Sequence, residues 1–237
     1  MDGSDEPENT SHAIHFLESG NDDNGNDILI EQASRCFEAP MTLGDLLRQI
    51  REYYLIRFKK GLEEIQRSGK QSAISEEVLL TSDGKPARGG VLQLPMRVDL
   101  IVVENGRVVD SIRIDTEKML TFAPFELIWD GMSVCVSGFK WNEMRFTCTS
   151  GDTPISMGPL QEWFSKWFFE QDSAPRDGFL ELIHFLSDPS WQASSVIFEV
   201  DMGSAPVDAF EDLLDVLASL HIKKVEFGSQ PMQRASE

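Results

Sequence analysis

The stretch that most constrains the fold is residues 194–228, which specifies three consecutive elements and the turns between them. Residues 195–200 form a β-branched and aromatic run that predicts a strand. A turn follows in which the Ser204 hydroxyl can cap a helix, and apolar residues then recur at helical spacing over residues 206–220. Residues 222–227 alternate as a second strand. This βαβ pattern predicts a right-handed crossover that places the two strands in parallel in one sheet.

Three further helices are predicted upstream. The longest spans residues 43–68, where an apolar stripe at 3.6-residue spacing follows a capping box formed by Thr42 and Asp45. A second helix at residues 159–170 carries a strongly aromatic face. A short helix is expected at residues 179–186, where an Asp-Pro pair would stop it.

The middle of the chain predicts an antiparallel sheet. Residues 98–102 and 108–114 flank an Asn-Gly turn of the kind that closes two-residue hairpins. Further strands are expected at residues 125–129, 132–136 and 143–149, which alternate between apolar and polar side chains. The fold class is therefore α+β: a mixed, largely antiparallel sheet covered mainly on one face by helices, with a C-terminal βαβ unit.

Composition divides the chain into segments. Residues 1–27 hold eight acidic residues and neither lysine nor arginine, which predicts a disordered acidic tail. An N-terminal helical segment (28–70), a polar linker or loop (71–90), the α+β domain (91–229) and a frayed C-terminus (230–237) follow.

Charge excludes one class of partner. The chain carries 40 acidic against 21 basic residues, a net charge of −19, whereas a surface that follows nucleic-acid phosphates needs an excess of lysine and arginine. We therefore expect no nucleic acid and favour a basic protein partner. No apolar run long enough to span a membrane and no secretory signal is visible, so a soluble cytoplasmic protein without membrane insertion is expected.

Cysteine usage agrees with a reducing compartment, because three cysteines do not make a disulfide framework. Cys135 and Cys148 lie on strands that are expected to form one hairpin, so they could face each other. Two buried free thiols are the favoured alternative. The sequence leaves their pairing and the oligomeric state open.

No set of residues indicates catalysis. The turn before the last helix has one glycine and a carboxylate that would repel a phosphate, which argues against a nucleotide site there. Ser204, His184 and Asp201 are the available set for hydrolysis, but the serine lies in no G-x-S-x-G elbow. Histidine and cysteine spacing matches no metal motif. We therefore expect no catalytic residues, no cofactor and no metal, and whether the protein is an enzyme stays open, with the balance against it.

One resemblance bears on function. The strand end Phe198-Glu199-Val200-Asp201, the helix that begins near Pro206 and the exit Leu-His-Ile-Lys-Lys-Val-Glu-Phe are similar to the last βαβ portion of the periplasmic domains of ExbD/TolR-type energy-transducing proteins. The resemblance implies a subunit of a larger envelope or motor assembly.

The favoured function is that of a non-enzymatic, acidic interaction protein that neutralises or escorts a basic partner, like an immunity protein, an antitoxin or an adaptor. The alternatives are the envelope or motor subunit just described and an enzyme whose active-site residues are dispersed along the chain. The basic residues of the first long helix, the aromatic face of the second and the acids of the last are candidate partner-binding residues: Arg57, Lys59, Lys60, Trp163, Trp167, Asp208, Asp212 and Asp215.

Overall fold

The computed structural model describes the chain in nine stretches: residues 20–21, 27–28, 42–67, 72–105, 107–116, 122–150, 155–169, 178–192 and 194–229. Strands β1 (Gly20–Asn21) and β2 (Asp27–Ile28) pair antiparallel. Apart from these two strands, the predicted acidic tail lies outside the described residues, as does the predicted frayed C-terminus.

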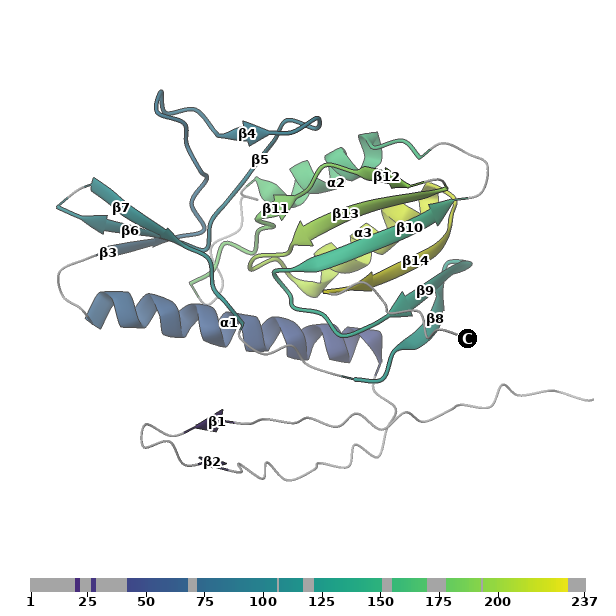
Figure 1. Cartoon of the computed structure of the whole chain (residues 1–237), viewed down its shortest axis with the longest axis horizontal. Helices are drawn as coiled ribbons and strands as arrows, with labels where there is room; N and C mark the ends of the chain where they lie inside the picture. Colours follow the sequence, from purple (N-terminus) through teal and green to yellow (C-terminus); the bar gives the residue numbers. More distant parts are fainter. Residues whose placement is uncertain are drawn as a thin grey trace, which may run out of the picture.

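A mixed sheet forms the centre of the molecule, with strand order β11-β13-β10-β14-β9-β8 and β12 paired to β13 (Figure 1). Its pairs are antiparallel except for β14 with β9. The strands are β8 (Phe125–Trp129), β9 (Met132–Val136), β10 (Met144–Ser150), β11 (Phe185–Leu186), β12 (Ser190–Gln192), β13 (Ser195–Asp201) and β14 (Ile222–Gly228). The three strands expected upstream of the βαβ unit, at 125–129, 132–136 and 143–149, are confirmed as β8, β9 and β10.

The C-terminal βαβ unit is confirmed, with one strand inserted. β13 and β14 both pair antiparallel with β10, so they run parallel to each other and are separated by it. Helix α3 (Val207–Ser219) connects them. Pro206 is the N-cap residue of α3 and no side chain caps this end, so the cap expected from Ser204 is wrong.

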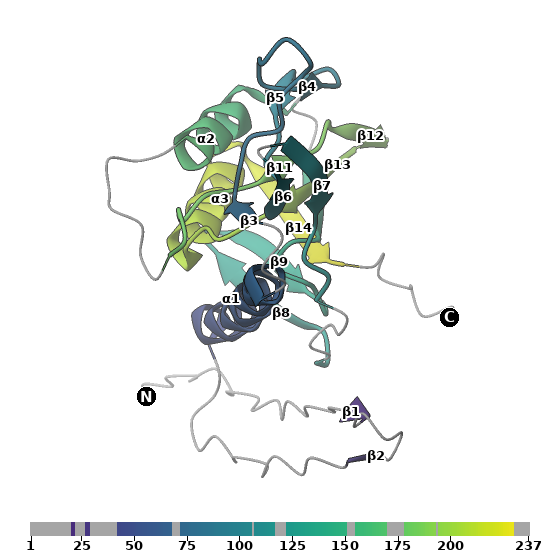
Figure 2. The same ribbon diagram turned by 90° about the vertical axis from the view of Figure 1, so that its left-hand side faces the viewer.

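Helices cover one face of the sheet. Figures 1 and 2 show α2 (Gly158–Phe168) and α3 together on one side, with α1 (Leu43–Arg67) alongside α3. Alternate side chains of β10 and β13 are buried on this side, and Phe146 stacks on Phe198 with ring centroids 5.2 Å apart. The capping box is confirmed, because the Asp45 backbone N–H donates to the Thr42 hydroxyl over 3.2 Å and the Thr42 N–H donates to the Asp45 carboxylate over 3.3 Å. The α+β fold class is therefore confirmed.

A smaller sheet packs beside α1. β3 (Ser72–Ser75) pairs with β6 (Leu100–Glu104), and β6 forms the expected Asn-Gly hairpin with β7 (Arg107–Ile112). Two further strands, β4 (Arg88–Gly89) and β5 (Leu94–Pro95), pair in an arm that projects from the body (Figure 1). The division into segments stays a prediction, but residues 71–90 contain strands β3 and β4 rather than loop alone.

The short helix expected at residues 179–186 is wrong. This segment is extended and ends in β11, although its apolar residues recur at helical spacing. Its backbone donors are used by distant partners: the N–H of Ile183 donates to Trp167 O over 3.0 Å, and that of His184 to Asp201 O over 3.0 Å. Glu181 also adopts a left-handed φ of 60°, which a helix cannot contain. Tertiary hydrogen bonds therefore override the local pattern.

The predicted pairing of two cysteine strands is also wrong. β14 lies between β9 and β10, so Cys135 and Cys148 are not on one hairpin. Cys148 pairs with Val225 and Cys135 with the next residue, Glu226, which places the two thiols on opposite faces. Both thiols are buried and free.

No helix among the described residues has the length and apolar character needed to cross a membrane.

Candidate functional site

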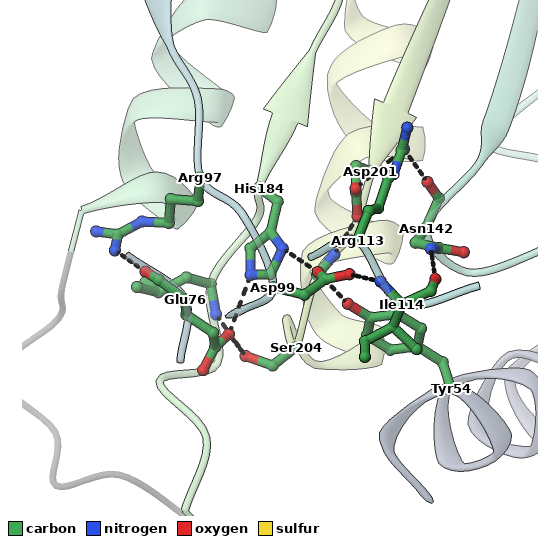
Figure 3. Close-up of polar contacts among 12 residues, drawn as sticks. Tyr54, Glu76, Arg97, Asp99, Arg113, Ile114, Asn142, His184, Asp201 and Ser204 are labelled. Carbon is green, nitrogen blue, oxygen red and sulfur yellow. Dashed lines mark hydrogen bonds and ion pairs between the residues drawn. The ribbon is translucent and has the colours of Figure 1, made fainter. Parts of the chain in front are cut away.

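A buried polar network lies where α1, the small sheet and the edge of the central sheet meet (Figure 3). We call it the His184 network; its members are Tyr54, Glu76, Asp99, Arg113, His184, Asp201 and Ser204. Backbone hydrogen bonds align the segments that carry these side chains. Glu76 N donates to Asp99 O over 2.8 Å, and Arg97 N donates to His184 O over 2.9 Å. The second bond joins the segment that precedes β6 to the segment that precedes β11.

His184 is the centre of the network. Its ring Nδ1 lies 2.8 Å from Asp99 Oδ1 and its Nε2 lies 3.2 Å from Glu76 Oε1, and the imidazole is completely buried. Burial alone would lower the pKa of His184, but its hydrogen bonds to Asp99 and Glu76 and the nearby charge of Asp201 raise that pKa to about 10. The ring is therefore an imidazolium at neutral pH and donates from both nitrogens.

The carboxylates around the imidazolium are held in different ways. Asp99 accepts from the Tyr54 hydroxyl over 2.7 Å and from the Ile114 N–H. Burial would raise the pKa of Asp99, but His184 and Tyr54 hold it below its usual value. Burial raises the pKa of Asp201 to about 6, although His184 and Arg113 favour its charged form. Asp201 is therefore the network member closest to gaining a proton at mildly acidic pH.

The network contains Ser204, His184 and Asp201, the three residues considered for hydrolysis, but it does not arrange them for that reaction. Nucleophilic catalysis needs a base that takes the serine proton. The Ser204 hydroxyl instead donates to Glu76 and accepts from the Leu182 N–H over 3.1 Å. The imidazolium has no free lone pair, and its side chain is 0% exposed.

Among the described residues, three members of the His184 network lie close enough together to be considered as metal ligands. One ligand atom each from Asp99, His184 and Asp201 lies within 4.8 Å of the others. A metal ion at His184 would have to displace a carboxylate and a proton from the ring, because both nitrogens are engaged. The donor set therefore fits a protonated histidine between carboxylates better than a metal.

Backbone conformations around His184 show how tightly the network is packed. Glu76 has a left-handed φ of 55° while its carboxylate is buried, and Gly203 has a φ of 50°. A Cβ on Gly203 would lie 2.3 Å from His184 Cδ2. Glu76 also accepts the Leu180 N–H over 2.7 Å. A left-handed conformation at a residue other than glycine persists only where surrounding contacts determine it, so the hydrogen bonds of Glu76 help to fix the junction of the two sheets.

The acids predicted for partner binding gather on the outer face of α3. Helix α3 contains no basic residue. Its four acidic residues are Asp208, Glu211, Asp212 and Asp215. Asp208 and Asp215 are exposed, and Asp212 is partly exposed. Tryptophans border this face from neighbouring elements, because Trp167 Nε1 donates to Asp212 over 3.1 Å and Trp129 Nε1 donates to Asp215 over 2.8 Å. We call these four acids and two tryptophans the acidic α3 face.

The other predicted residues lie elsewhere. Trp163 is buried and its indole N–H donates to Ala209 O over 2.9 Å, so it packs α2 against α3 and is not available to a partner. Lys59 and Lys60 are exposed on the second half of α1, with Lys59 Nζ 5.6 Å from the Phe179 ring centroid, and Arg57 is partly buried on the same helix. The structure therefore brings Trp167, Asp208, Asp212 and Asp215 together and leaves the basic residues on α1.

Sequence reasoning missed Trp129 in the acidic α3 face, and it missed Glu76 and Asp99 in the His184 network. Asp99 stands between Val98 and Leu100 in an apolar run, a signal that its carboxylate is buried and paired. Glu76 lies in a polar stretch without such a signal. Comparisons with protein-family models, with curated proteins and with solved structures each found no match to this chain.

Proposed function

We propose that this protein is a non-enzymatic recognition protein that binds a basic protein partner through the acidic α3 face. The observation that carries the proposal is the set of four carboxylates on α3, without a basic residue in that helix, bordered by two partly buried tryptophans. Carboxylates steer a basic partner toward this face, and tryptophan is enriched among residues that dominate binding energy.

Charge and chemistry support the same class of function. The whole chain has a net charge of −19, so its long-range field attracts cations. In the His184 network every member except Arg113 is buried, and its side chains hydrogen-bond to one another, as expected for a structural role. An inhibitor of a basic protein, such as an immunity protein or antitoxin, or an adaptor that escorts one, matches these features. We place it in the cytoplasm, where the free thiols of Cys135 and Cys148 would stay reduced.

The test is affinity capture with the full-length chain from its native source. The variant Asp208→Asn/Asp215→Asn removes two charges from the acidic α3 face, while the amide introduced by Asp215→Asn keeps an oxygen that can accept the Trp129 indole N–H. The control Glu63→Gln/Glu64→Gln removes two exposed charges from α1. We expect a basic protein that is retained by the wild type and the control but lost by the α3 variant. Equal capture by all three chains would overturn the proposal.

A further inference from the structure

A cation already occupies part of the acidic α3 face. Lys166, on α2, places its Nζ 4.8 Å from the centroid of the Trp167 ring and pairs with the carboxylate of Asp212. The same carboxylate accepts the Trp167 indole N–H over 3.1 Å, which orients the ring beside it. A cation over an aromatic face next to a carboxylate is one arrangement by which proteins recognise lysine and arginine side chains.

This site is accessible from solvent. The side chain of Lys166 is 55% exposed and that of Asp212 is 37% exposed. The surface of α2 beside it is open and is lined by Gly158, Gln161, Glu162, Ser165 and Lys166. The exposed Glu162 adds a carboxylate on the α2 side, as Asp208 and Asp215 do on the α3 side. A cationic side chain from outside can therefore reach the position that Lys166 holds.

We infer that Trp167 and Asp212 form a cation-binding subsite for a lysine or arginine side chain of the partner, and that Lys166 is an internal occupant which this side chain displaces. The inference rests on the proposed function and specifies its chemistry. Exposed ion pairs are weak because water screens them and both side chains lose freedom, so the exchange of one cation for another costs little. The planar guanidinium of an arginine can also stack on the tryptophan ring, whereas the Lys166 ammonium interacts with the ring only as a point charge.

Lys166 therefore acts as a competitor. It neutralises Asp212 while no partner is bound, and it reduces the apparent affinity for any external cation by the fraction of time it occupies the subsite. Removing its charge should strengthen binding, which is the opposite of what a residue that merely supports the fold would do.

The experiment uses the full-length chain and two small probes, N-acetyl-lysine methylamide and its uncharged analogue N-acetyl-norleucine methylamide. Binding is followed at low salt by the indole N–H resonance of Trp167, assigned by its loss in Trp167→Phe. Lys166→Met frees the subsite, whereas Lys85→Met removes the same charge from an exposed pair with Asp83 on the projecting arm.

We expect the lysine probe to bind Lys166→Met at least about threefold more tightly than the wild type, in line with the size of exposed cation–π interactions. Lys85→Met should behave as the wild type, and the norleucine probe should not bind. Asp212→Asn, which still accepts the Trp167 N–H, should abolish binding. Equal affinities of Lys166→Met and the wild type for the lysine probe would overturn the inference. So would chemical-shift changes that leave the indole N–H resonance of Trp167 unmoved. A failed proposed function would show itself separately, as partner capture indifferent to the charges of Asp208 and Asp215.

Discussion

His184 should make the stability of the protein fall as the pH rises above neutrality. Its pKa is about 10 in the folded protein, against 6.5 for an ordinary histidine. Between these values the folded chain holds a proton that the unfolded chain has released, so rising pH favours unfolding. The contribution is fully present below pH 6.5 and is lost as the pH approaches 10. Asp201, with a pKa of about 6, is ionised throughout the range above pH 7 and adds no slope there.

The magnitude follows from the two pKa values. The protonated imidazole contributes on the order of 4 kcal/mol to the free energy of unfolding at pH 7 and about 2 kcal/mol at pH 8.5. The protein should therefore lose about 2 kcal/mol over this interval through His184 alone. His184→Gln cannot carry this proton, and it leaves Asp99 and Glu76 buried without their cation, at a cost of about 3–5 kcal/mol at pH 7.

The assay is urea unfolding at pH 7.0 and 8.5, followed by tryptophan fluorescence. The pH-dependent loss should be present in the wild type and absent in His184→Gln. Ser204→Ala is the matched control, because it weakens the network yet keeps both partners of His184. If His184→Gln does not fold, the carbon resonances of the His184 ring in the wild type decide: they should stay those of an imidazolium to pH 8.5. Titration near pH 6.5 would refute the account of the network.

Two substitutions, each compared with a control substitution, test the packing by urea unfolding. Gly203→Ala should cost about 3 kcal/mol or more, because its Cβ would meet the His184 ring, whereas Gly131→Ala, at a φ of 78° in open space, should cost about 1 kcal/mol; similar costs would mean that the contact with His184 is not tight. Phe210→Ala should cost about 3–5 kcal/mol because Phe210 is completely buried, whereas Asp208→Ala should stay within about 0.5 kcal/mol; equal effects would contradict the orientation of α3.

Much of the fold could be predicted because the signals are local. The capping box at Thr42, the Asn-Gly turn and the βαβ pattern each involve neighbouring residues, and each is confirmed. The segment at 179–186 was mispredicted because its backbone donors bond to residues far away, among them Ser204 and Asp201. Local periodicity cannot report such partners.

The site was predictable only in part. The acids of α3 are visible in the sequence because they share one side of a strongly amphipathic helix. Their tryptophan neighbours come from β8 and α2, and no local pattern connects Trp129 with Asp215 across 86 residues. The network was hidden for the same reason, since Glu76 and Ser204 are 128 residues apart.

The salt dependence of association with the captured partner tests the central claim most directly. The wild-type association rate should fall about tenfold or more between about 0.05 and 0.5 M salt while dissociation changes less, because charge steers the encounter. Asp208→Asn/Asp215→Asn should flatten this dependence, and deletion of residues 1–27, which removes eight acidic residues, should leave most of it. A rate indifferent to salt, or a dependence that vanishes with residues 1–27 and survives the α3 substitutions, would contradict recognition through the acidic α3 face.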